Sequence, residues 1–184
     1  MQVGIDKHRG IKYIGKDARL FNEWEKIDER FKDDGQVSYI IRKRNALDLP
    51  TEYDIYFNIK TITGVEEADE QGLQKPIFEK KEHEMRITLP NNYPGAEVLF
   101  TFRTPVWHPN IRYFGDFKGH VCLNQRDNGV FTSLVEYIDR VIHYLLYEDY
   151  HAINDYPYPE DLEVAKWVRE QAEPQGWLQF KQDE

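Results

Sequence analysis

The sequence feature that most constrains the fold is a change of hydrophobic period along the chain. Between residues 83 and 103 apolar and polar residues alternate in two stretches, with Met85, Ile87 and Leu89 on one face of the first and Val98, Phe100 and Phe102 on one face of the second. This alternation predicts two half-buried β-strands. Residues 37–42 and 53–60 are rich in β-branched and aromatic residues and predict two more. Four strands at short spacing predict an antiparallel meander.

Helical periods flank these strands on both sides. Before them, apolar residues recur at steps of four, three and four, at Leu20, Trp24, Ile27 and Phe31. This stripe predicts an amphipathic helix with Asp17 as its N-cap, and its charged side, which includes Glu23, is interpreted as solvent-exposed. After the strands, Ser133 and Glu136 form a capping box that opens a second apolar stripe, and Glu136 is spaced to pair with Arg140.

A last helix is predicted to open at Pro159, with Glu160 and Asp161 in its first turn. It is predicted to turn Leu162, Ala165 and Val168 or Arg169 inward. The order of helix, four strands, irregular segment and two helices predicts an α+β domain over residues 17–173. Residues 1–16 are expected to be a loosely attached N-terminal extension. Residues 174–184 form a tail that either packs back through its apolar residues or awaits a partner. Residues 63–80 are predicted to be a long loop or an irregular hairpin.

Charge and cysteine content exclude several classes of protein. The 184 residues suit one domain, and their 24 basic and 33 acidic side chains give a net charge of −9, which disfavours nucleic-acid binding and membrane attachment through basic residues. The single cysteine excludes an internal disulfide and a zinc site with two cysteine ligands. No apolar run approaches a membrane span and no signal peptide is visible, so a cytoplasmic location is expected. Neither a phosphate-binding glycine loop nor a helical histidine pair is present, so no cofactor and no metal are expected.

Residues 104–129 have no clear period and contain two prolines and three glycines. Long irregular segments in compact domains are often functional. The only cysteine, Cys122, lies in this segment. A thiol with an ordinary pKa is about 3% thiolate at pH 7, which suffices for exchange with an incoming thioester. The alternative is a buried and inert cysteine.

Four short motifs resemble the ubiquitin-conjugating enzyme family. They are Tyr93-Pro94, the Phe-x-Phe-x-x-Pro run that ends at Pro105, the His-Pro-Asn tripeptide 108–110, and Cys122 followed by Leu and Asn. The resemblance covers about residues 17–173 and implies the fold of that family. Eleven residues separate Asn110 from Cys122, more than is usual, and the extra loop with Tyr113, Phe114 and Phe117 is expected to cover the site.

The resemblance implies roles for several residues. Cys122 would carry the modifier, and Asn110 would stabilise the oxyanion or hold the active-site backbone, although an asparagine also simply closes turns. His108 would be structural. His120 would point to the same side as Cys122 on an extended chain and could act as a base, or it is an exposed loop histidine.

A lysine acceptor must lose a proton before it attacks the thioester. The resemblance implies that an acidic or small polar residue on the loop after the second helix, residues 148–155, approaches the site. Asp155 is the first candidate for this role, with Asn154 and His151 as alternatives, and each could instead be a solvated loop residue. The favoured function is transfer of a ubiquitin-like modifier from a thioester on Cys122 to a lysine. The expected partners are the modifier, an activating enzyme, an acceptor protein and a ligase. The alternatives are a catalytically inactive binding module of the same fold and a Cys–His hydrolase.

Overall fold

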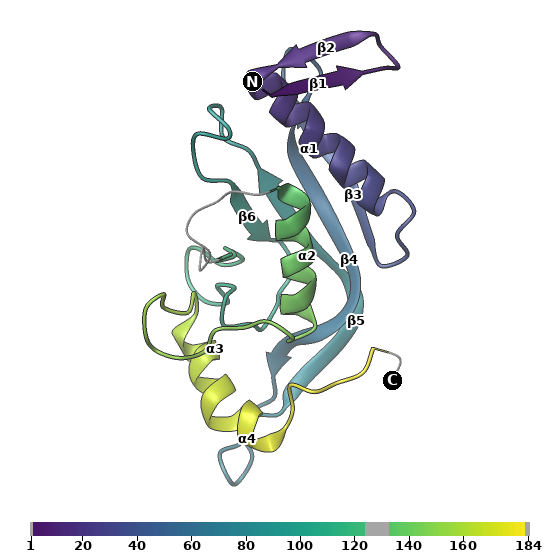
Figure 1. Cartoon of the computed structure of the whole chain (residues 1–184). Coiled ribbons are helices and arrows are strands. Elements are labelled where there is room, and N and C mark those ends of the chain that lie inside the picture. The colour runs from purple at the N-terminus through teal and green to yellow at the C-terminus, as the bar shows by residue number, and fades with distance from the viewer. Residues whose placement is uncertain (1, 124–132, 183–184) are drawn as a thin grey trace.

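The structure, a computed structural model, describes residues 2–123 and 133–182 (Figure 1). Its elements in chain order are β1 (Val3–Asp6), β2 (Ile11–Ile14), α1 (Gly15–Phe31), β3 (Val37–Arg44), β4 (Pro50–Val65), β5 (Pro76–Thr88), β6 (Leu99–Phe102), α2 (Leu134–Leu145), α3 (Leu162–Trp167), a π-helical turn (Val168–Ala172) and α4 (Glu173–Gln175). The four strands β3-β4-β5-β6 pair in that order, each antiparallel to its neighbour. The predicted α+β fold with a four-stranded meander is confirmed.

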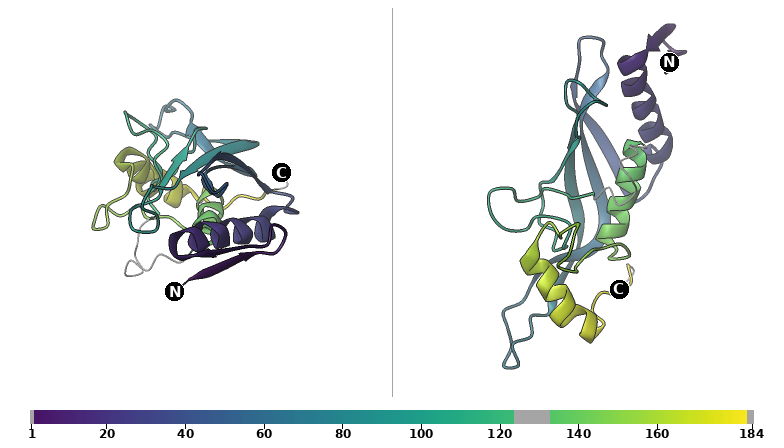
Figure 2. Two further views of the ribbon diagram at one scale, coloured as in Figure 1. Left: turned by 90° about the horizontal axis from the view of Figure 1, so that it is seen from above. Right: turned by 60° about the vertical axis from the view of Figure 1, so that its left-hand side comes forward.

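The core lies between the sheet and two helices. Figure 2 shows α1 and α2 on the same side of the sheet. The inner face of β4 and β5 contributes Ile55, Phe57 and Ile87, each with no exposed surface. Ile138 and Val141 of α2 are equally buried against it. The alternation in the strands and the apolar stripe of α2 therefore meet as their periods predict.

Residues 2–16 pack against the domain, so the expectation of a loosely attached extension is wrong for them. β1 and β2 pair as a hairpin against α1, and the rings of Tyr13 and Phe21 lie 5.2 Å apart. Gly4 permits this contact, because a Cβ atom there would lie 2.9 Å from Phe21. The helix begins at Gly15 with Ile14 as its N-cap, and Asp17 lies in the first turn rather than at the cap.

Glu23 is buried, which contradicts its interpretation as a solvent-exposed residue. Its Oε2 accepts a hydrogen bond of 2.8 Å from the backbone N–H of Leu134, and its Oε1 lies 2.7 Å from Nε of Arg19. The carboxylate thus joins α1 to the positive N-terminus of α2. The predicted cap by Ser133 is confirmed.

Arg140 of α2, predicted to pair with Glu136, forms an ion pair of 3.1 Å with Asp149 instead. The partner comes from the connection that follows α2. Side-chain spacing within a helix gives no information about such a neighbour.

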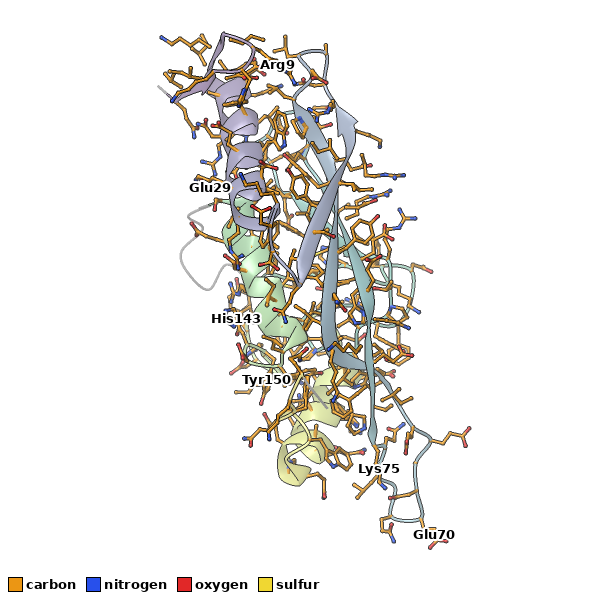
Figure 3. All side chains as sticks on the ribbon, turned by 90° about the vertical axis from the view of Figure 1, so that its right-hand side faces the viewer. Arg9, Glu29, Glu70, Lys75, His143 and Tyr150 are labelled. Carbon is orange, nitrogen blue, oxygen red and sulfur yellow. The ribbon has the colours of Figure 1, made fainter. Side chains whose placement is uncertain are left out.

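The irregular hairpin, one of two alternatives for residues 63–80, is confirmed. β4 continues to Val65, β5 resumes at Pro76, and the turn between them, with Glu70 and Lys75, extends beyond the rest of the sheet (Figure 3). The tail packs back on this hairpin. The rings of Phe180 and Phe78 lie 4.9 Å apart, and the side chain of Gln182 bonds both the N–H and the C=O of Lys60.

The last helix begins later than predicted. Asp161, not a residue in its first turn, is the N-cap, and Leu162 is 56% exposed rather than inward-facing. Ala165 and Val168 are buried as predicted. None of the helices in residues 2–123 and 133–182 is long and apolar enough to cross a membrane. Within the same residues no three His, Cys, Asp or Glu side chains are grouped so as to hold a metal ion.

Candidate active site

The segment before Cys122 is more regular than its sequence predicts. Ile111 and Val121 form an antiparallel bridge, so the extra residues close into a small hairpin. Its second arm extends the sheet at β6, because Val121 N–H donates to Phe100 O at 3.0 Å and Phe102 N–H donates to Gly119 O at 2.7 Å. Cys122 therefore follows directly on a short strand. Residues 124–129 of the predicted irregular segment, including Asn124 of the motif, lie outside the described residues.

Gly119 makes this pairing possible. Its φ is +91°, which L side chains rarely adopt, and a Cβ atom there would lie only 2.0 Å from the backbone oxygen of Phe102. No other residue fits without displacing β6 from the strand. The glycine thus fixes the register in which residues 119–121 pair with β6, and with it the position of Cys122.

The backbone of Cys122 is held on both sides. Its N–H donates to the carbonyl of Asn110 at 2.8 Å, and its C=O accepts from the hydroxyl of Tyr144 at 3.2 Å. The side chain is half-buried rather than sealed in the core. Tyr144 comes from α2 and was not identified from the sequence, where it is one aromatic residue in an apolar stripe. It links the cysteine to the rigid core.

Asn110 is buried and joins the Cys122 strand to the connection after α2. Its side-chain Oδ1 accepts a hydrogen bond of 2.8 Å from the backbone N–H of His151, while its own C=O receives the N–H of Cys122. These contacts hold the backbone of two segments together. The oxyanion role remains a prediction.

His108 is fully buried and both its ring nitrogens have backbone partners. Nδ1 accepts the N–H of Asn110 at 3.1 Å, so Nε2 carries the proton and donates it to the C=O of Asp149 at 3.1 Å. The ring stacks on Tyr144 with centroids 4.6 Å apart. Burial lowers the pKa of His108 to about 3, which keeps it neutral. These are the contacts of a structural histidine.

The side chain of His120 contacts the carboxylate of Glu160. Its Nδ1 lies 3.1 Å from Oε1 of Glu160, which also receives Nε of Arg112 at 3.3 Å. Two aromatic residues of the extra loop pack on Trp107: the rings of Tyr113 and Phe114 lie 4.7 and 5.8 Å from that of Trp107. The expected cover over the thiol stays a prediction. Phe117 is 75% exposed.

The three candidates on the connection after α2 differ in burial. His151 is buried, and its Nε2 lies 3.3 Å from Oδ1 of Asp155, whose side chain is 64% exposed. Asn154 is exposed. The structure therefore ties His151, and through it Asp155, to the Asn110–Cys122 pair.

Asp161 organises the site and was placed by the sequence only in the first turn of a helix. Its Oδ1 caps α3, while its Oδ2 accepts the backbone N–H groups of Tyr113 at 2.8 Å and Phe114 at 3.3 Å. Its own N–H donates to the C=O of Pro109 at 2.9 Å. One residue thus fixes the His-Pro-Asn turn, the extra hairpin and α3. An Asp directly before a helical period is the signal that could have identified the cap.

Comparisons with known proteins agree with this geometry. A family profile described as "Ubiquitin-conjugating enzyme" matches residues 66–142. The ubiquitin-conjugating enzyme E2-20 kDa of Schizosaccharomyces pombe is 33% identical over 64 residues, which cover 35% of this chain and 30% of that protein. The aligned region thus spans less than a third of the curated relative.

Two solved structures share the fold. A putative ubiquitin conjugating enzyme from Plasmodium yoelii has a TM-score of 0.55 and 21% identity over 89% of this chain and 90% of its own. The conjugating-enzyme domain of a Toxoplasma gondii protein has a TM-score of 0.54 and 20% identity over 88% of this chain and 89% of its own. Residues 66–142 thus match the sequence profile of the ubiquitin-conjugating enzymes, and the chain shares the fold of the two solved structures.

Proposed function

We propose that this protein carries ubiquitin or a ubiquitin-like modifier as a thioester on Cys122 and transfers it to a lysine. The observation that carries the proposal is the position of Cys122: half-buried, directly after a strand, with its backbone held by Asn110 and Tyr144. A nucleophile needs such a fixed geometry, because misplacement by about 1 Å can cost a hundredfold in rate.

The chemistry takes two exchanges. The Cys122 thiolate attacks the thioester carbonyl of the modifier on an activating enzyme, a new C–S bond forms, and the thiolate of that enzyme leaves. The neutral amine of a lysine then attacks the same carbonyl, the Cys122 thiolate leaves, and the amine proton passes to a base or to water. The amide of Asn110 would stabilise the oxyanion, and Asp155 would orient the amine.

The partners follow from these exchanges. The modifier, an activating enzyme and an acceptor protein are required, and a ligase would bring the acceptor to the protein loaded on Cys122. The protein itself would need no ATP, because the energy arrives in the preformed thioester.

The test loads the protein without depending on the correct activating enzyme. The full chain is mixed with a ubiquitin-like protein that bears a small-molecule C-terminal thioester, and in parallel with activating enzyme, modifier and ATP. We expect an adduct that thiols cleave, none in Cys122→Ala, and a thiol-resistant oxyester in Cys122→Ser. An adduct that persists in Cys122→Ala contradicts the proposal, and so does modifier binding without any adduct, which is the outcome expected of an inactive binding module.

The hydrolase alternative is tested with the same material. If His120 were a catalytic base, His120→Ala would abolish cleavage of a modifier ester. We expect thioester formation in His120→Ala to be nearly unchanged, because the imidazole is engaged by Glu160.

A further inference from the structure

His120 and Cys122 project from the same face of the short strand that follows the extra hairpin. Hydrogen bonds on both sides keep this strand extended: Val121 donates its N–H to β6, and the C=O of His120 accepts the N–H of Arg112 at 2.9 Å. Side chains alternate along such a strand, and Val121 is 4% exposed while its two neighbours are only partly buried. The Cα atoms of His120 and Cys122 are therefore about 7 Å apart, with both side chains on the solvent side.

Glu160 holds the imidazole of His120 in a defined orientation. Its Oε1 lies 3.1 Å from Nδ1 of His120 and 3.3 Å from Nε of Arg112. The side chain of Glu160 is 16% exposed and that of His120 is 36% exposed, so the acid is mostly covered while the ring stays accessible. A carboxylate beside Nδ1 favours the tautomer with its proton on that nitrogen. The lone pair of Nε2 is then available to accept a proton.

A nucleophile, a histidine and an acid that orients it thus lie in sequence along one surface. On the β6 side the pairing partner of His120 is Thr101, which carries no charge. The two steps of the proposed reaction differ in what they need. Thioester exchange starts from a thiolate and releases a thiolate, whereas a lysine must give up a proton as its nitrogen bonds to the carbonyl carbon. The accessible imidazole beside Cys122 suits the second step, in which a histidine is the most frequent proton acceptor.

We infer that His120 is the general base of the transfer step and that Glu160 is its positioning residue. The inference rests on the proposed function and names the group that receives the amine proton. As the neutral lysine nitrogen bonds to the thioester carbonyl carbon, Nε2 of His120 takes a proton from that nitrogen. The C–S bond then breaks, Cys122 leaves as a thiolate, and the imidazolium returns the proton to this thiolate.

The test compares two nucleophiles on the loaded protein. The full chain is loaded from a small-molecule thioester of the modifier, and single-turnover discharge is followed to free lysine and to hydroxylamine. Hydroxylamine is the weaker base, so its nitrogen loses a proton to water more readily. We expect His120→Gln to load like the wild type but to discharge to lysine roughly a hundredfold more slowly, at the lower end of the contribution of a general base. Discharge to hydroxylamine should change little.

Two further variants separate proton transfer from folding. His120→Ala should regain part of its rate with lysine when free imidazole is added, which a structural defect would not do. Glu160→Gln places an amide N–H beside Nδ1 and favours a proton on Nε2, so discharge at saturating lysine should fall while discharge to hydroxylamine is retained. His143→Gln is the matched control, because Nδ1 of His143 lies 2.6 Å from Glu148 on the exposed side of α2 (Figure 3). Its discharge to lysine should equal that of the wild type.

The outcomes distinguish the base from the carrier. If His120→Gln loads and then discharges to lysine at the rate of the wild type, or slows equally with both nucleophiles, the inference is overturned and the proposed function stands. A defect in His120→Ala that imidazole leaves unchanged also overturns it. A wild-type chain that does not load at all contradicts the proposed function, and the inference falls with it.

Discussion

The inner face of the sheet and the segment around Cys122 are built in different ways. Residues such as Ile55 and Phe57 are buried among many apolar neighbours, and no single contact decides their position. Around Cys122, each segment is held by individual hydrogen bonds from Asn110, Tyr144 and Asp161. Apolar packing is additive and weakly directional, whereas a hydrogen bond fixes one geometry.

This difference predicts two classes of variant. Loss of apolar volume in the sheet should lower the free energy of unfolding. The activity of the molecules that remain folded should stay unchanged. Loss of one polar contact near Cys122 should lower the free energy of unfolding less than a sheet variant does, and should lower the activity more. The following experiments test that division from the largest expected effect to the smallest.

Phe57→Ala should produce the largest loss of stability. Phe57 has no exposed surface and its ring lies 6.0 Å from that of Phe102. The cavity should lower the free energy of unfolding by about 3–5 kcal/mol, measured by denaturant titration. Thioester formation per folded molecule, measured at low temperature, should stay unchanged. A proportional loss of both quantities would erase the distinction between the two regions.

His108 should make the stability depend on pH. Its folded pKa of about 3 lies below the value of about 6.5 expected in the unfolded chain, so as pH falls the unfolded chain binds the proton first. The stabilisation is complete above pH 6.5 and decreases as pH falls toward 3. Between pH 7 and pH 5 the free energy of unfolding should decrease by about 2 kcal/mol from this group.

Denaturant titrations at pH 5, 6 and 7 measure this effect. These pH values lie above the range in which Asp34 and Asp54 are protonated. Burial alone would raise the pKa values of these two carboxyl groups, but hydrogen bonds lower them, from backbone N–H groups to Asp34 and from Arg86 to Asp54. His108→Gln should reduce the dependence, and the part that remains includes His83, whose pKa is also lowered by burial. His143→Gln, on the exposed side of α2, leaves His108 in place and should preserve it. A steep dependence that survives in His108→Gln would show that another group is responsible.

Gly119→Ala should disturb the site more than the fold. The left-handed backbone alone costs a non-glycine residue about 1–2 kcal/mol, and the Cβ atom would also strike Phe102. Gly115→Ala is a matched control, because its φ is +80° but no atom lies within 4 Å of the added Cβ. Both variants should lose similar stability from strain. Only Gly119→Ala should slow thioester formation and alter the rate of Cys122 alkylation, and equal rates in the two would contradict the assigned register.

How far the sequence predicted the structure follows from the same division. The strands, α1 and α2 are visible because an apolar face repeats at a fixed period, and the cap at Ser133 uses a local motif. Glu23 and Tyr144 were misplaced or missed because their partners are distant in the sequence: Glu23 meets Leu134 across 111 positions. The contacts of Asp161 with Tyr113 and Phe114 are equally hidden, although its cap of α3 is local. Cys122 and Asn110 were found through motifs, but the hydrogen bond between them depends on an eleven-residue hairpin whose pairing no local pattern predicts.

Asp161 gives the smallest expected loss of stability. Asp161→Ala removes the cap of α3 and should lower the free energy of unfolding by about 1 kcal/mol. Asp161→Asn retains an oxygen for capping, since asparagine is as good an N-cap as aspartate, but has only one acceptor oxygen for the two sets of N–H groups. It should therefore keep nearly full stability in denaturant titration while slowing thioester formation. If Asp161→Asn matches the wild type in both measurements, the extra hairpin is positioned by its packing on Trp107. Apolar packing would then hold the site in place, as it holds the sheet, and the hydrogen bonds of Asp161 would not.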